Sequence, residues 1–163
     1  MANILNTGTY GGGKSKVILD VTQNIDELQL FKSGFNYGSV NFEKQSDGSY
    51  KLWFTTAGTG GNCCGISIPE EYQSYKAFII KFRNLSLTGN GSITLMANCK
   101  VDSSRNAPYD GELCIKIPNR DGYYSLGSCG WSGEKVGDTI GIGFVANGAT
   151  DTVYITYLVL LDY

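Results

Sequence analysis

The fold of this chain is decided by one stretch near its middle, Tyr75-Lys76-Ala77-Phe78-Ile79-Ile80-Lys81-Phe82-Arg83. Phe78, Ile80 and Phe82 occupy every second position, with a lysine between the last two. Because successive side chains of a β-strand point to opposite faces, this alternation predicts a strand with one apolar face and one mixed face. Such a strand is typical of an antiparallel sheet that covers a core with one of its faces.

Similar alternation recurs along the chain at the spacing typical of β-sandwiches. Three further segments place apolar side chains on one face: Ile93, Leu95 and Ala97; Leu113, Ile115 and Ile117; and Ile140, Ile142 and Phe144. We predict ten strands, at Lys16–Val21, Leu28–Lys32, Ser39–Glu43, Ser49–Thr55, Cys64–Ile68, Tyr75–Arg83, Ser92–Asn98, Glu112–Ile117, Thr139–Val145 and Thr152–Leu161. The predicted fold is all-β, an antiparallel two-sheet β-sandwich of jelly-roll topology.

The connections between these strands carry turn chemistry. Hairpin turns are expected at three segments that contain Asp-Gly or Asn-Gly: Ser46–Ser49, Thr88–Gly91 and Ala146–Ala149. Helix is expected only at Pro69–Ser74, where Pro69 would occupy the first helical position, and at Asn24–Leu28.

Length and composition indicate one domain and exclude several partners. The 163 residues match one ordinary domain, with residues 16–163 as the sandwich and residues 1–15 as a flexible Gly-rich arm. A net charge of −2 without a basic run argues against a nucleic-acid partner. The most apolar stretch, Val153–Leu161, is too short to span a bilayer, so membrane insertion is not expected. The N-terminus lacks the basic and apolar regions of a signal peptide, which predicts synthesis in a cytoplasm.

Histidine is absent, which removes the Ser-His-Asp and Cys-His constellations and most catalytic zinc sites. The five cysteines are odd in number, and Cys63 and Cys64 are adjacent, which suits neither a disulfide framework nor zinc spacing. Cys99 and Cys114 extend apolar strand patterns, so we predict burial as small apolar side chains. A metal site and a disulfide are the alternatives.

One motif imitates a phosphate-binding loop. Gly8–Ser15 fits the pattern G-x-x-x-x-G-K-S. That loop needs a strand before it and a helix after it, so that the helix N-terminus faces the phosphates. Here only Ile4 and Leu5 precede the motif, and a predicted strand follows it. We therefore interpret the motif as a chance match.

Aromatic side chains in polar, glycine-rich segments form the candidate binding site. An exposed loop aromatic is costly without a purpose, and the flat C–H face of a sugar ring stacks on aromatic rings. The predicted ligand-binding residues are Arg105, Asn106, Tyr109, Asp110, Arg120, Asp121, Tyr123, Tyr124 and Trp131. The alternative is that these aromatic rings cover the edge of the core. Trp53 lies within a strand beside Leu52 and is expected in the core.

The order of four segments resembles the jelly-roll carbohydrate-binding modules and the related galactose-binding-like domains, over roughly Lys16 to Tyr163. The segments are Asp47–Phe54, Tyr75–Phe82, Asp138–Phe144 and Val153–Leu160. The resemblance implies a non-enzymatic domain that binds a glycan or cell-surface polysaccharide. It also implies a structural calcium ion near the first and last strands, for which Asp20 and Asp162 are the candidate ligands; no other cofactor is expected.

Similar domains without a signal peptide occur in phage tail, baseplate and decoration proteins. The resemblance therefore implies a virion component that acts in host attachment, contacts other virion proteins and forms a homo-oligomer. Two alternatives remain open. One is a purely structural virion protein, for capsid decoration or tail assembly. The other is a small glycoside hydrolase or lyase that uses two carboxylates, although no spacing in the sequence singles out a pair.

Overall fold

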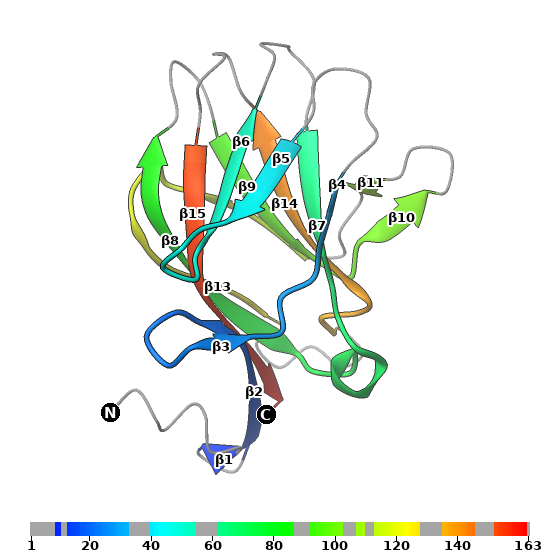
Figure 1. The fold of residues 1–163 in the computed structure, drawn as a ribbon. Helices are drawn as coiled ribbons and strands as arrows, with labels where there is room; N and C mark the ends of the chain where they lie inside the picture. The colour runs from blue at the N-terminus through cyan, green and yellow to red at the C-terminus, as the bar shows by residue number, and fades with distance from the viewer. Residues whose placement is uncertain are drawn as a thin grey trace.

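A computed structural model describes residues 9–10, 13–32, 40–54, 62–86, 92–102, 107–109, 113–127, 135–145 and 152–162. Two antiparallel sheets form the two layers of a sandwich (Figure 1). The large sheet contains β1 (Thr9–Tyr10), β2 (Gly13–Asp20), β3 (Ile25–Asp26), β5 (Val40–Lys44), β6 (Tyr50–Phe54), β8 (Ala77–Ser86), β13 (Gly122–Gly127) and β15 (Thr152–Asp162). The small sheet contains β4 (Leu30–Lys32), β7 (Asn62–Ser67), β9 (Ser92–Ala97), β12 (Leu113–Ile117) and β14 (Thr139–Val145).

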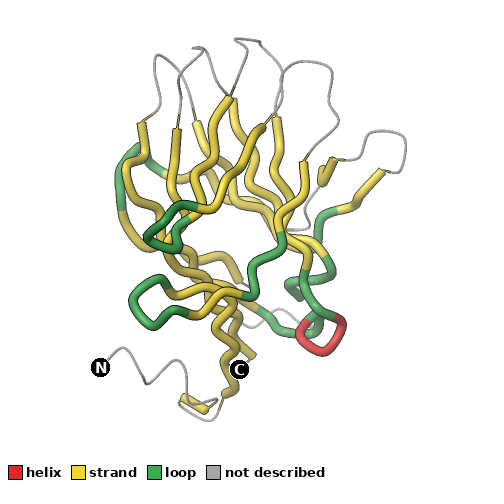
Figure 2. The backbone as a smooth tube through the Cα atoms, viewed as in Figure 1, coloured by secondary structure: helices red, strands yellow, loops and turns green. Residues whose placement is uncertain are grey.

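These two sheets confirm the predicted all-β sandwich, and all ten predicted strands form. Strands dominate the described chain in Figure 2, where the helical turn η2 (Glu70–Tyr72) stands out in red. That turn lies within the predicted helix at Pro69–Ser74. A separate hairpin, β10 (Lys100–Asp102) with β11 (Ala107–Tyr109), was not predicted. In the described part of the chain, no helix is long and apolar enough to cross a membrane.

Strand β15 organises the large sheet. One of its edges pairs with β8. Its other edge pairs with β6 over Thr152–Ile155 and then with β2 over Tyr157–Asp162. Thr156 lies where β15 changes partners. The sheet therefore divides beside Thr156, with β6 and β5 on one side and β2 and its neighbours on the other.

The core lies between the sheets, where the alternation predicted it. Phe78, Ile80 and Phe82 of β8 are fully buried. From the small sheet, Ile93, Leu95, Ala97, Ile140 and Ile142 join the same apolar cluster, as predicted. Ile117 is also buried, but Ile115 is 42% exposed. The described pairings give β12 only one neighbour, β9, so its outer edge leaves Ile115 uncovered. The side chains of Leu113 and Phe144 lie outside the described residues.

One local prediction was wrong. Asn24–Leu28 is not helical: Asn24 has a positive φ of 56° and ends a turn, and the short strand β3 follows it. The segments Thr88–Gly91 and Ala146–Ala149 lie outside the described residues. The strands on either side of them, β8 and β9, and β14 and β15, belong to different sheets.

The third predicted turn, Ser46–Ser49, is confirmed because β5 and β6 pair on either side of it. Gly48 takes a φ of 88°, which favours glycine.

The motif that imitates a phosphate loop has the wrong context, as predicted. Lys14 and Ser15 lie in β2, which begins at Gly13 and pairs with β1 through Tyr10. A strand offers no helix N-terminus to a phosphate.

Candidate functional site

Strand β13 carries two tyrosines that the sequence places on a loop, and turns them to opposite faces of the large sheet. Gly122–Gly127 pairs with β8, so the loop prediction for both tyrosines was wrong. Tyr124 packs against the core, with its ring centroid 6.1 Å from that of Phe82, and its hydroxyl donates to the Arg120 carbonyl. Tyr123 is 62% exposed. It lies on the face of the large sheet that points away from the small sheet, which we call the outer face.

A β-bulge in β15 brings two more tyrosines to the outer face. The pairing of β15 with β8 shifts register between Ile155 and Tyr157, so Thr156 is the extra residue. Core-facing side chains are odd-numbered before the bulge and even-numbered after it. Tyr154 and Tyr157 therefore share the outer face although they are three positions apart, which a regular strand does not allow.

Cross-strand pairing arranges the outer face into two rows. The first row consists of Tyr123, Lys81, Tyr157 and Asp20, on β13, β8, β15 and β2. The second consists of Arg83, Tyr154, Lys51 and Glu43, on β8, β15, β6 and β5. Directly opposite side chains on neighbouring strands are close enough to contact one another. The first row therefore alternates between aromatic and charged groups, and the second places Tyr154 between two cations, Arg83 and Lys51.

The first row surrounds a pocket of ≈ 540 Å³. The rings of Tyr123 and Tyr157 meet edge to face, with centroids 5.9 Å apart and planes at 77°. Lys81 Nζ lies 4.8 Å from the Tyr123 ring centroid. The pocket is lined by Asp20, Val21, Thr22, Ile79, Lys81, Arg83, Tyr123, Thr156 and Tyr157. It combines a flat aromatic surface with cations and hydroxyls.

Arg83 joins the pocket to the second row. Its guanidinium carbon lies 5.5 Å from the Tyr154 ring centroid, and its Nη2 donates to Asp47 Oδ2 at 2.7 Å and to Ser49 Oγ at 3.3 Å. The buried Ser49 hydroxyl also donates to Asp47. The Ser49 hydroxyl, followed by the Arg83 guanidinium, holds the pKa of Asp47 well below its usual range. The turn between β5 and β6 thus fixes an arginine from a distant strand.

Trp53 extends the aromatic surface beyond the second row. Leu52 is fully buried, so the alternation of β6 places Trp53 on the outer face, and its prediction as a core residue was wrong. Lys51 Nζ lies 5.3 Å from the Trp53 ring centroid. The outer face therefore carries three pairs of an aromatic ring and a cation, each contributing about 0.5–1 kcal/mol at exposed sites.

Three polar atoms at the pocket are buried without a hydrogen-bond partner among the described residues: Thr156 Oγ1, Tyr157 Oη and Arg83 Nε. Thr156 as a whole is only 6% exposed. A buried polar group without a partner costs about 1–3 kcal/mol. These atoms mark positions where polar groups of a ligand would be stabilised.

The Tyr157 hydroxyl gives the pocket a measurable property at alkaline pH. Burial, followed by the nearby charge of Asp20, raises the pKa of Tyr157 to about 12 from 10.0. Between these two pH values only the unfolded chain releases this proton. The protonated Tyr157 hydroxyl therefore makes its full contribution to the free energy of unfolding below pH 10, and this contribution is lost as the pH rises to about 12. We expect the tyrosinate absorbance that Tyr157→Phe removes to titrate near pH 12.

The Tyr157→Phe variant should also lose less stability than the wild type across the same pH range, measured by chemical unfolding. If the tyrosinate absorbance of the wild type minus that of Tyr157→Phe titrates near the ordinary tyrosine pKa of about 10, the result contradicts the buried position of this hydroxyl.

The two candidate calcium ligands do not share a site. Asp20 pairs with Tyr157, whereas Asp162 pairs with Lys14, five residues further along β15. At about 3.3 Å per residue their backbones are roughly 17 Å apart. Asp20 Oδ1 instead accepts the backbone N–H and the hydroxyl of Thr22. Within the described residues, no group of three or more histidine, cysteine or acidic side chains is placed to hold a metal.

The cysteine prediction holds where the structure describes the side chains. Cys64 and Cys99 are buried, and burial raises the pKa of Cys64 to about 12. A thiol that resists ionisation at neutral pH is neither a nucleophile nor a ready metal ligand.

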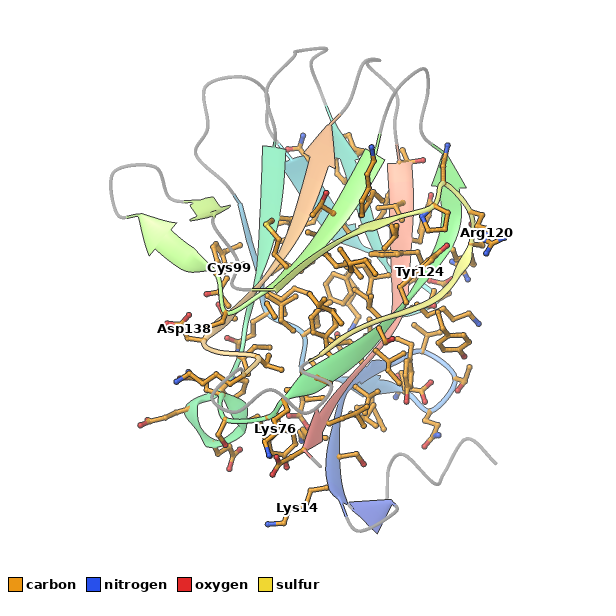
Figure 3. The ribbon with its side chains drawn as sticks, turned by 180° about the vertical axis from the view of Figure 1, so that it is seen from behind. Lys14, Lys76, Cys99, Arg120, Tyr124 and Asp138 are labelled. Carbon is orange, nitrogen blue, oxygen red and sulfur yellow. The ribbon has the colours of Figure 1, made fainter. Side chains whose placement is uncertain are left out.

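The structure distributes the predicted ligand-binding residues over several places. Tyr123 lines the pocket, Tyr124 faces the core, and Arg120 and Asp121 lie exposed in the turn before β13. Figure 3 shows Arg120 at the rim of the molecule and Tyr124 directed inward. Tyr109 belongs to β11, which contacts β7 and β14 of the small sheet. Four of the predicted residues lie outside the described residues: Arg105, Asn106, Asp110 and Trp131.

Most of the pocket was missed by the sequence analysis. Lys81 and Arg83 alternate with the core residues of β8, a signal that the sequence analysis left unused, whereas the positions of Tyr154 and Tyr157 on β15 become clear only once the bulge is known. The chemistry of the pocket suits binding. Asp20 is the only carboxylate among its lining residues, so the described pocket does not offer the two facing carboxylates of a glycosidase.

Comparison with known proteins identifies the fold. Neither a protein-family model nor a curated protein matches the chain. A mutant of CBM29-2, a family 29 carbohydrate-binding module, superposes with a TM-score of 0.57 at 13% identity, covering 91% of this chain and 85% of that one. CBM29_1 from Piromyces equi gives 0.53 at 9% identity, over 93% and 91%. The family 11 module of the Clostridium thermocellum cellulase Lic26A-Cel5E gives 0.50 at 11% identity, over 90% and 93%. The chain therefore has the β-sandwich fold of these modules, as the resemblance implied.

Proposed function

We propose that this chain is a non-enzymatic carbohydrate-binding module whose binding site is the outer face of the large sheet. The observation that carries the proposal is the set of three aromatic–cation pairs on that face, two of which contribute side chains to one pocket. Sugar rings present flat C–H surfaces that pack on aromatic rings, while their hydroxyls need fixed polar partners. The outer face offers both within one surface.

The polar partners are positioned before any ligand binds. Asp47 and Ser49 hold Arg83, and the bulge holds Thr156 and Tyr157 at the pocket. A site fixed in advance loses little conformational freedom on binding, which favours affinity. Solved relatives of the same fold include a CBM29-2 mutant complexed with cellulohexaose and a family 11 module in complex with a mixed-linked tetrasaccharide, and these complexes support a glycan as the ligand class.

Tryptophan fluorescence locates the site, because the chain has only two tryptophans, Trp53 and Trp131. Titration with cellulohexaose, mannohexaose and a panel of soluble polysaccharides is expected to change the emission for the bound glycan. The change should disappear in Trp53→Phe, whose ring lies on the outer face, and persist in Trp131→Phe. If Trp131→Phe removes the change and Trp53→Phe keeps it, the site lies on the loop that the sequence analysis favoured. If no glycan binds, the proposal fails.

We extend the proposal to a setting: an adhesion module of a phage virion that contacts the host surface, assembled as a homo-oligomer with other virion proteins. The resemblance seen in the sequence and the Gly-, Asn- and Tyr-rich composition support this setting. Neighbouring genes that encode tail or capsid proteins are the expected finding. Mass photometry is expected to give a symmetric multimer, and a monomer at micromolar concentration contradicts that part of the proposal.

A further inference from the structure

We propose that the pocket selects a sugar that carries an acidic group, the carboxylate of a uronic acid, and that Lys81 is its counter-ion. This inference rests on the proposed function and specifies the ligand class of the same site. It begins from the surroundings of the cations on the large sheet.

Every other described cation in the strands of the large sheet has a carboxylate beside it. Three are in ion pairs: Lys16 with Glu27, Lys44 with Asp26 and Arg83 with Asp47. Two lie directly opposite a carboxylate on the neighbouring strand: Lys14 opposite Asp162 and Lys51 opposite Glu43. Pairing opposite charges is therefore the rule on this sheet.

Lys81 departs from that rule. Its two cross-strand neighbours are Tyr123 and Tyr157, and none of the ion pairs found among the described residues includes it. The nearest carboxylate in its row, Asp20, lies two strands away, about 10 Å between backbones. Lys81 is only partly exposed, and its ammonium lies over the Tyr123 ring at the pocket. A partly desolvated ammonium without a carboxylate partner attracts an anion.

Apart from Asp20, the other polar side chains of the pocket can also donate hydrogen bonds. Thr156 Oγ1, Tyr157 Oη and Arg83 Nε can each donate a hydrogen bond, and none has a partner among the described residues. Of the two oxygens of Asp20, Oδ1 already accepts from Thr22. Donors thus outnumber acceptors in the pocket. A carboxylate supplies only acceptors, up to about four lone-pair positions, whereas a neutral sugar hydroxyl supplies both kinds of group.

The test compares each acidic polysaccharide with its own neutral form. Polygalacturonate, alginate and hyaluronan are assayed by affinity electrophoresis and calorimetry beside their carboxyl-reduced forms, which keep the linkages and remove the charge. At least one uronan is expected to bind about tenfold or more tightly than its reduced form, the size expected for one charge-assisted hydrogen bond. Dextran sulfate, a polyanion without carboxylates, should bind no better than the reduced polymers.

Two variants separate the effect of Lys81 on binding from the effect of the protein's net charge. Lys81→Met keeps the apolar stem and should remove the preference for the uronan, with Lys81→Gln as a second variant if the first does not fold. Lys14→Met loses the same charge on an exposed position of β2, outside the pocket, and should keep the uronan affinity within about twofold.

Three outcomes overturn the inference. If the carboxyl-reduced forms, or neutral glucans and mannans, bind as well as the uronans or better, the uronic acid inference is wrong but the proposed function stays intact. Equal binding of dextran sulfate, or equal losses in Lys14→Met and Lys81→Met, reduces it to general electrostatic attraction. Failure of every acidic and neutral glycan to bind removes the proposed function as well.

Discussion

Replacing Phe82 with alanine is expected to lower the free energy of unfolding by about 3–5 kcal/mol. Phe82 is fully buried between the sheets and contacts the Tyr124 ring. Truncation removes the apolar transfer free energy of the ring and leaves a cavity that a close-packed interior fills only partly. Urea unfolding followed by circular dichroism measures the loss.

The matched control for Phe82→Ala is its neighbour on the same strand. Lys81→Ala removes a side chain from the outer face and should cost no more than about 1 kcal/mol, the size of its cation–π contact with Tyr123. The pair tests the alternation of β8, on which both the core and the site depend. Similar losses in the two variants contradict the assignment of one residue to the core and the other to the pocket.

The alternation of β8 could be read directly from the sequence because its inward positions are all large and apolar. Strand β13 gave no such signal. Gly122–Gly127 contains two adjacent tyrosines and one aliphatic residue, Leu126, so its period-2 pattern is hidden. Pairing with β8 makes it a strand, and that partner is far away in the sequence. Tertiary pairing, rather than local propensity, decides such a segment.

The bulge explains why the contribution of β15 to the outer face could not be predicted. Tyr154 and Tyr157 have opposite parity in the sequence, so a regular strand places one of them in the core. The extra residue, Thr156, lies where β15 exchanges β6 for β2 as its neighbour. That exchange depends on where two other strands end, and no local motif in β15 encodes it. The prediction for Trp53 was wrong for a related reason: its apolar neighbours suggested a core position, but Leu52 faces inward and the alternation turns Trp53 outward.

Turn residues were a better guide to reversals than to topology. Ser46–Ser49 joins two paired strands, and its Asp47 also holds Arg83 of β8 at the site. The strands that flank the other two Asn-Gly segments, β8 and β9, and β14 and β15, belong to different sheets instead. In a sandwich, the choice between a hairpin and a crossover depends on which strand edges remain open, and this information lies outside the turn itself.

Replacing Tyr123 with alanine is expected to weaken glycan binding about 30-fold, the loss typical of an important aromatic contact. Its ring is 62% exposed, lines the pocket and contacts both Lys81 and Tyr157. Because the ring is outside the core, the loss of stability should be limited to its contacts with Lys81 and Tyr157, about 1–2 kcal/mol and less than the loss in Phe82→Ala. Calorimetric titration with the glycan identified by the fluorescence panel measures the affinity of each variant.

Two controls make the Tyr123 result specific. Tyr123→Phe keeps the ring and should bind within about threefold of the wild type, since packing rather than the hydroxyl carries the contact. Ile115→Ala truncates the other large apolar side chain that is exposed among the described residues, on β12 of the small sheet, and should leave binding unchanged. Wild-type affinity in Tyr123→Ala would falsify the outer-face site. Equal losses in Tyr123→Phe and Tyr123→Ala would instead assign the contact to the hydroxyl, and glycan recognition at this position would then depend on hydrogen bonding rather than on stacking.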